Sequence, residues 1–110
     1  MTQHHVDLPH AKSLQEAGWD KKTERVFSYC PDLGYQSDWY MFAADNPDPH
    51  PLIWQPNVME LLDVVTYDDL QLYRWFGPAT HEYFPEWLYH TIKDPNTLAD
   101  VWVWGKEGKK

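Results

Sequence analysis

Histidine side chains are the first groups in this chain that could do chemistry. A neutral imidazole binds metal ions and exchanges protons near neutral pH. Three histidines lie near the N-terminus, but no HExxH pattern joins them and no cysteine stands beside them. We therefore interpret them as solvated side chains and predict neither a metal site nor a bound cofactor. The six histidines are His4, His5, His10, His50, His81 and His90.

Paired carboxylates are the second possible source of chemistry. Two carboxylates can divide the roles of acid and base when their surroundings push their pKa values apart. The chain holds 17 Asp and Glu residues, so such pairs also arise by chance, and we interpret them as a solvated acidic face. A small hydrolase or metal-dependent enzyme that uses His and Asp or Glu is the alternative. The pairs are Asp45 and Asp48, Asp68 and Asp69, and Glu82 and Glu86.

Cys30 is the single cysteine, so neither an internal disulfide nor a cysteine-based zinc site is expected. At the end of a predicted strand it resembles a small buried hydrophobe more than a nucleophile. A single thiol suits a reducing compartment, and the first ten residues lack the apolar run of a signal peptide. No stretch approaches the roughly 20 apolar residues of a membrane span. We therefore expect a cytoplasmic protein without membrane association.

The formal net charge of −8 bears on the kind of partner. Nucleic-acid backbones are bound by Lys and Arg, so direct nucleic-acid binding is not expected. A protein with a basic surface is the more natural partner, because complementary charge speeds encounter. The seven Trp and seven Tyr residues exceed what one small core needs. Interfaces favour such rings as hot spots, whereas a Trp-rich core with partly exposed edges is the plainer interpretation.

The elements that must position these groups begin with a helix at 8–17, capped by Asp7 and ended by Gly18. Strands are predicted at 25–30 and 37–43 from their β-branched and aromatic content. A central helix then starts at Asn57, with Glu60 completing a capping box. Its apolar stripe is expected to face the sheet, and residues 66–69 are expected to end it. The stripe consists of Val58, Leu61, Leu62 and Val65.

The C-terminal half predicts one or two further strands and a last helix. Alternating residues favour a strand at 70–75, and the aromatic segment 81–92 is interpreted as a strand, with Pro85 restricting it to an edge. Pro85 could instead open a short helix through Ile92. Asp94 and Pro95 start the last helix. We predict one α+β domain spanning 1–110, with a small antiparallel sheet of three to four strands and three helices in the order α-β-β-α-β-(β)-α, and with flexible ends at 1–6 and 106–110.

Three blocks carry a resemblance to small proteins encoded by bacteriophages and prophages. They are LQEAGW at 14–19, PNVMELL at 56–62 and NTLADVWVW at 96–104. These blocks are similar to the LxEAGF, PTxxELL and DTxADA-like helix blocks of that group. Asn57 stands where the group usually has Thr, and the segment 81–92 with its internal proline departs from the pattern. The resemblance implies a phage origin and a compact α+β fold, and it carries no activity.

These observations together predict a small acidic protein that is not an enzyme and binds another protein with a basic surface. The sharper hypothesis is an inhibitor of a host defence nuclease, whose nucleic-acid channel is basic. A structural or accessory phage protein without catalytic activity is a further alternative. The predicted contacts are acidic residues on the two loops beside the central helix and rings in excess of the core. They are Asp45, Asp48, Asp68, Asp69, Trp75, Phe76 and Trp87.

Overall fold

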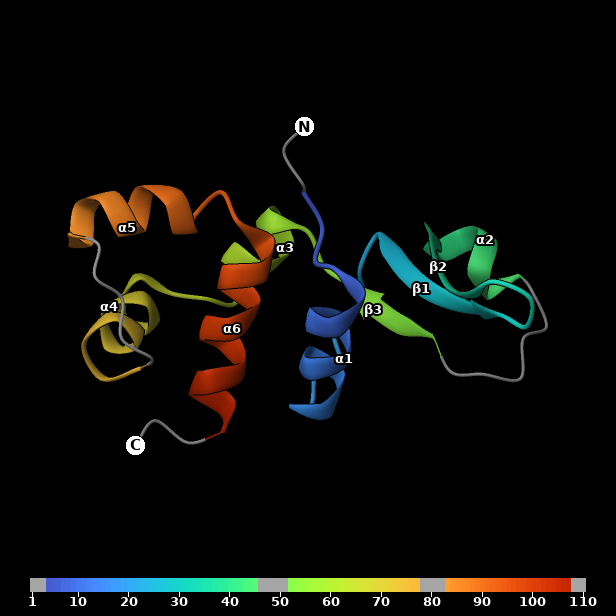
Figure 1. The fold of residues 1–110 in the computed structure, drawn as a ribbon, viewed down its shortest axis with the longest axis horizontal. Helices are drawn as coiled ribbons and strands as arrows, with labels where there is room; N and C mark the ends of the chain where they lie inside the picture. The colour runs from blue at the N-terminus through green and yellow to red at the C-terminus, as the bar shows by residue number, and fades with distance from the viewer. Residues whose placement is uncertain (1–3, 46–51, 78–82, 108–110) are drawn as a thin grey trace.

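The computed structural model describes residues 4–45, 52–77 and 83–107. Within these ranges the chain forms a three-stranded antiparallel sheet and six helices, so the α+β class with a small sheet is confirmed. The molecule is elongated, with extents of 46 × 32 × 23 Å. The sheet and α2 lie at one end, α4 and α5 at the other, and α1 and α6 side by side between them (Figure 1). None of the described helices is long and apolar enough to cross a bilayer.

Helix α1 (Leu8–Glu16) begins and ends where the sequence predicts. The Asp7 carboxylate accepts a hydrogen bond from the backbone N–H of His10. At the other end Gly18 adopts a φ of +101°, a left-handed conformation that a side chain disfavours. The N–H of Trp19 then bonds to the carbonyl of Leu14, which closes the helix. The buried Trp19 ring is thereby fixed directly behind the helix end.

The sheet contains β1 (Arg25–Cys30), β2 (Gly34–Trp39) and β3 (Ile53–Gln55) in the order β2-β1-β3. The prediction of a strand over 37–43 is wrong beyond Trp39, because the chain there turns into the short helix α2 (Tyr40–Ala44). The N–H of Tyr40 bonds to the carbonyl of Glu24, and Ala43 is buried. The helical turn lets α2 fold back onto β1 and β2. The third strand is β3 and not the predicted segment 70–75.

Helix α3 (Val58–Leu62) has the predicted capping box, in which the side chains and backbones of Asn57 and Glu60 bond reciprocally. Its predicted extent and orientation are wrong. The helix lasts five residues and packs against α6 instead of the sheet. Leu61 and Val65 are buried, whereas Val58 is half-buried and Leu62 is exposed. The chain after α3 is bent so that a second helix can begin.

Helix α4 (Tyr67–Phe76) replaces the strand predicted at 70–75. Residues 66–69 start this helix and do not end the previous one, because Thr66 and Asp69 form a second capping box. The apolar alternation that suggested a strand is also compatible with a helix, in which Leu70 and Tyr73 lie one turn apart and both join the core. The capping signal therefore outweighs the period-two pattern.

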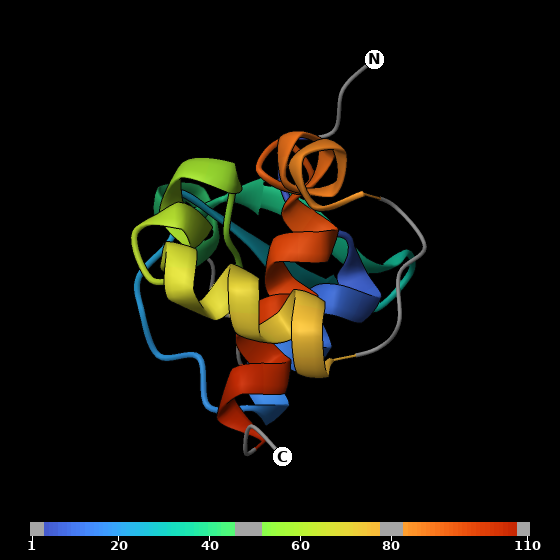
Figure 2. The same ribbon diagram turned by 90° about the vertical axis from the view of Figure 1, so that its left-hand side faces the viewer.

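Helix α5 (Phe84–Thr91) replaces the strand predicted for 81–92, and the alternative in which Pro85 opens a helix is confirmed. Proline is tolerated there because the first turn needs no N–H donor. Residues 81 and 82 lie outside the described ranges. Helix α6 (Pro95–Lys106) begins after the predicted cap Asp94 and contacts α1, α3, α4 and α5. Figure 2 shows α4 crossing in front of α6, with α5 near its upper end.

The prediction that residues 1–6 lie loosely fails for the described part of that segment. His5 forms a β-bridge with Asn57, and the N–H of Val6 bonds to the carbonyl of Pro56. Val6 has 0% exposure and belongs to the core. At the other end, Lys106 is part of α6. The strand-like N-terminal segment therefore helps to hold the entry into α3.

Candidate interaction surface

One face of α4 brings together two of the residues predicted for binding. Asp68 and Trp75 are separated by two helical turns and therefore share a face. Together with Gln71 and Leu72 they line a shallow hollow on this face. The Trp75 side chain is 77% exposed, and Phe76 beside it is also exposed. The face thus presents a carboxylate at its N-terminal end and a large ring at its C-terminal end.

Two other predicted residues at this end have structural roles. Asp69 is half-buried, and its carboxylate accepts from the backbone N–H of Thr66 at 2.9 Å. Trp87 is only 6% exposed and stacks on Tyr73, with ring centroids 6.0 Å apart. The suggestion that Trp87 serves as an exposed contact is therefore wrong. Its ring packs between α5 and α4 in the core.

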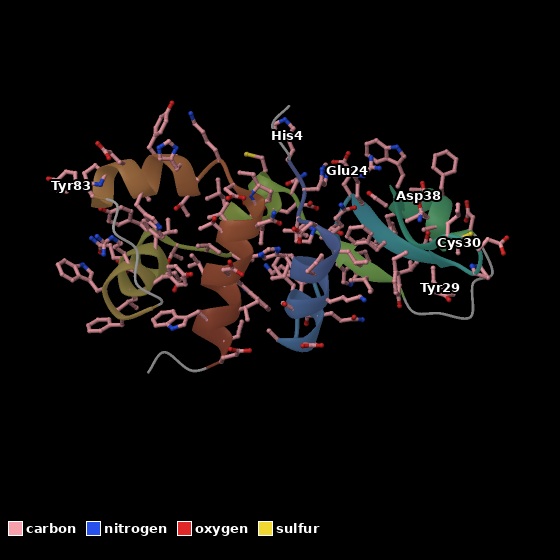
Figure 3. The ribbon with its side chains drawn as sticks, viewed as in Figure 1. His4, Glu24, Tyr29, Cys30, Asp38 and Tyr83 are labelled. Carbon is pink, nitrogen blue, oxygen red and sulfur yellow. The ribbon has the colours of Figure 1, made fainter. Side chains whose placement is uncertain are left out.

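The remaining predicted residues do not join this surface. Asp45 is exposed at the end of α2, on the opposite end of the molecule from α4 (Figure 1). Asp48 lies outside the described residues. Figure 3 places Tyr83, which is also exposed, at the helical end, and places Asp38, Cys30 and Tyr29 at the sheet end. The expectation that Cys30 is buried is met only in part, because the residue is half-buried.

A cavity of about 520 Å³ lies beside the N-terminal end of α4. It is open to solvent on one side and is lined by the turn after α1, the segment between α3 and α4, the first turn of α4 and the C-terminal half of α6. Of its lining residues, sequence reasoning identified only Asp69. No local pattern could have revealed the others as a group, because they come from separate segments. The charged and aromatic lining residues are Trp19, Asp20, Lys21, Asp63, Asp69, Trp102 and Lys106.

The indole rings form a fixed wall of this cavity. Trp19 and Trp102 meet edge to face, with centroids 5.2 Å apart and an interplanar angle of 68°. The Trp19 Nε1–H donates to the backbone carbonyl of Lys21 at 2.8 Å, so its orientation is set by the turn. The ammonium of Lys106 lies 5.2 Å from the centroid of the Trp102 ring. The wall therefore already holds one cation against an aromatic face.

Cations elsewhere follow the same pattern. Five of the seven Lys and Arg side chains in the described ranges lie over aromatic rings, an arrangement that is favourable because the ring face is electronegative. In the structure each of these cations contacts a ring of the chain itself. Acidic side chains therefore outnumber the cations that do not contact a ring. The pairs are Lys12 with Tyr35, Lys22 with Tyr40, Arg25 with Trp39, Lys93 with Tyr89, and Lys106 with Trp102.

His10 is the histidine with the most developed surroundings, because a carboxylate faces each of its ring nitrogens. Nδ1 lies 2.5 Å from Asp7 and Nε2 lies 3.4 Å from Asp100, so the ring bridges α1 and α6. Burial opposes ionisation of Asp7, but the backbone N–H and ring of His10 outweigh it and lower the pKa of this carboxyl. Burial raises the pKa of Asp100, although His10 works in the other direction.

This arrangement around His10 holds two helices together and leaves neither nitrogen pointing into the cavity, whose lining excludes His10. Within residues 4–45, 52–77 and 83–107, no group of three His, Cys, Asp or Glu side chains has the arrangement of a metal site. The cavity and the exposed face of α4 present carboxylates and indole rings.

No family model matches this chain, and no curated protein or solved structure is significantly similar to it.

Proposed function

We propose that this chain is a non-catalytic binding protein that docks onto a basic surface of another protein. The docking surface is the exposed face of α4, which carries Asp68, Gln71, Leu72 and Trp75. The observation that carries the proposal is the placement of an exposed carboxylate and a 77% exposed indole on one face of a capped helix. A ring of this size gives a large contact area when a partner covers it.

Electrostatics supports a basic partner. The net charge is −8, and most described cations are held over the chain's own rings. At the α4 end, Asp63 and Asp68 are exposed and Asp69 is half-buried. Carboxylates grouped in this way attract a basic surface during diffusional encounter and repel an acidic one. A second copy of this chain would meet the same negative charge and is therefore disfavoured.

The proposal is tested by affinity capture with matched baits at low and moderate salt. The wild-type chain is compared with Asp68→Lys combined with Trp75→Ser, and with Asp32→Lys combined with Phe42→Ser. Both double variants change the charge by the same amount and remove one exposed ring, but the second does so at the sheet end. Captured proteins are quantified by mass spectrometry.

We expect one or more basic proteins whose capture is lost with the α4 variant, is retained with the sheet-end variant and decreases with added salt. Salt screens the interaction between exposed charges that lie more than about 8–10 Å apart. Identical captured sets for all three baits would contradict the proposed surface. Loss with both variants would mean that net charge alone governs the interaction.

A narrower form of the proposal takes the partner to be a host defence nuclease. The resemblance of the blocks 14–19, 56–62 and 96–104 to phage proteins supports this form, because such a protein would act in the cytoplasm of an infected cell. An acidic surface suits a basic nucleic-acid channel. In a DNA or RNA cleavage assay with a captured nuclease, the wild-type chain should inhibit and Asp68→Lys should inhibit less. Full cleavage at saturating wild-type chain would eliminate this form without affecting the broader one.

A further inference from the structure

The cavity beside α4 has a composition that the docking proposal leaves unexplained. We propose that it receives an arginine side chain of the partner, with the guanidinium against the Trp102 ring and the neighbouring carboxylates. This inference rests on the proposed function, because it names the group by which a basic partner would be recognised. It concerns the cavity and not the exposed face of α4, so the two can fail separately.

The position of Lys106 shows that the Trp102 ring accepts a cation. Its ammonium lies 5.2 Å from the ring centroid, within the range of a cation–π contact. Lys106 is exposed at the end of α6 and can therefore swing aside. Trp102, in contrast, is half-buried and rests against the buried Trp19. The receiving ring is fixed, and the cation that now covers it is replaceable.

The carboxylates that line the cavity give it a net negative charge. Asp20, Asp63 and Asp69 line it, and Lys21 and Lys106 supply the opposing charges. Carboxylates exceed ammonium groups by one while Lys106 is in place, and by two once it moves away. An anion would gain the two lysines but would meet three carboxylates. The lining therefore favours a cationic guest.

Arginine fits this lining better than lysine does. Its planar guanidinium stacks on an indole face and donates to carboxylates at the same time, whereas an ammonium is a compact and strongly hydrated charge. A volume of about 520 Å³ lies within the range of small-ligand sites and is ample for one side chain. Gly18 and Gly105 also line the cavity and add no side chain to its mouth.

The test uses N-acetyl-L-arginine amide as the probe, with free L-arginine and N-acetyl-L-lysine amide for comparison. Binding to the full chain is followed at low salt by the nuclear magnetic resonance signal of the Trp102 indole N–H. We expect a saturable shift with the blocked arginine and a weaker response to the blocked lysine. Free arginine should bind no better than the blocked form, because both have the same net charge and only the guanidinium side chain is expected to enter the cavity. Markedly tighter binding of the free amino acid would instead indicate a metabolite site and overturn the proposal.

Substitution of Lys106 provides the sharpest variant. Lys106→Met removes the internal competitor for the ring, so the blocked arginine should bind about two- to fivefold more tightly. The matched control is Lys93→Met, which removes a cation from the Tyr89 ring and makes the same charge change. Equal effects of the two substitutions would contradict competition at Trp102, because only net charge would then matter.

The carboxylates are tested by Asp20→Asn combined with Asp63→Asn, two exposed side chains that line the cavity. The blocked arginine should bind at least about twofold more weakly to this variant. Asp32→Asn combined with Asp45→Asn is the control at the sheet end and should bind like the wild type. If the probe fails to saturate, or if both pairs act alike, the cavity does not recognise arginine. Loss of capture with the α4 variants would still stand as support for the docking function.

Discussion

The two ends of this molecule both expose large apolar side chains, but they support them differently. At the sheet end, Leu33, Met41 and Phe42 are exposed. Two of them lie on α2, a five-residue helix that has no side-chain cap. At the helical end, Trp75 and Phe76 lie on α4, a ten-residue helix held by a capping box. The exposed rings at the two ends therefore differ in the length and the capping of the helix that carries them.

Because both ends expose large apolar side chains, ring exposure alone does not locate a binding surface. Recognition benefits when a contact residue is held in place before the partner arrives, because less freedom is lost on binding. Helix α4 holds Trp75 on a capped helix of ten residues. It also has Asp68 on the same face and a cavity beside it. The sheet end offers exposed apolar area on a shorter support. The docking surface that we propose therefore lies at the helical end.

The largest expected effect comes from the core that supports the helical end. Leu61 has 0% exposure, and Leu61→Ala should lower the free energy of unfolding by about 2–5 kcal/mol. The matched control is Leu33→Ala at the sheet end, where the side chain is 71% exposed and its loss should have little effect. Urea denaturation measures both. Similar denaturation midpoints for the two variants would contradict the expectation that Leu61 contributes to stability through core packing and Leu33 does not.

A smaller loss is expected at the N-terminal segment. Val6 is buried, and the side-chain amide of Gln55 donates to its carbonyl. Val6→Ala should therefore lower the free energy of unfolding by about 2 kcal/mol, and deletion of residues 1–6 should lower it further. Met59→Ala, at an exposed apolar side chain, is the control. An unchanged thermal midpoint after the deletion would show that this segment is dispensable.

The smallest effects concern the two carboxylates on either side of His10. The folded pKa of Asp7 is lowered, so its contribution to stability is present above the ordinary value of 3.8 and is lost as pH falls through the folded pKa. The folded pKa of Asp100 is raised, so its ionisation reduces stability as pH rises from 3.8 through the folded pKa. The two acids thus act in opposite directions at neutral pH.

Asp7→Asn should therefore lower the thermal midpoint at neutral pH, and Asp100→Asn should raise it. Asparagine can still cap the helix at position 7, but it loses the hydrogen bond that Asp7 Oδ2 accepts from the Asn96 side chain, so the change tests the charge together with this contact. Melting curves followed by circular dichroism should show both differences shrinking as the pH is lowered toward about 3, where carboxyl groups become protonated. Shifts of the same sign at neutral pH would contradict the opposite roles of the two acids.

Local signals in the sequence predicted the parts of the fold that depend on neighbours along the chain. Asp7, Gly18, Asn57 and Asp94 each mark a helix end through their own hydrogen bonds or backbone conformation. The strand β1 was likewise predicted with its observed bounds. These features are set by residues a few positions apart. They need no knowledge of the rest of the molecule.

The sequence predictions were wrong where two local patterns indicated different structures, or where contacts between distant segments determined the structure. Residues 70–75 alternate in a way typical of a strand, but the capping pair Thr66 and Asp69 starts a helix there. The burial of Trp87 depends on Tyr73 lying across from it. The cavity combines the turn after α1, the segment before α4, the start of α4 and the end of α6, and only Asp69 among its lining residues was predicted for binding. Sequence reasoning found the acidic and aromatic residue types but not their grouping.

The most direct test of the docking account measures association and dissociation rates of a captured partner at low and high salt. For the wild-type chain, association should slow as salt rises, because exposed charges are screened. Asp68→Lys should slow association severalfold, Trp75→Ala should speed dissociation, and Asp32→Lys at the sheet end should resemble the wild type. Rates that change neither with salt nor with Asp68→Lys or Trp75→Ala would contradict the account and would leave the negative charge with a role in solubility alone.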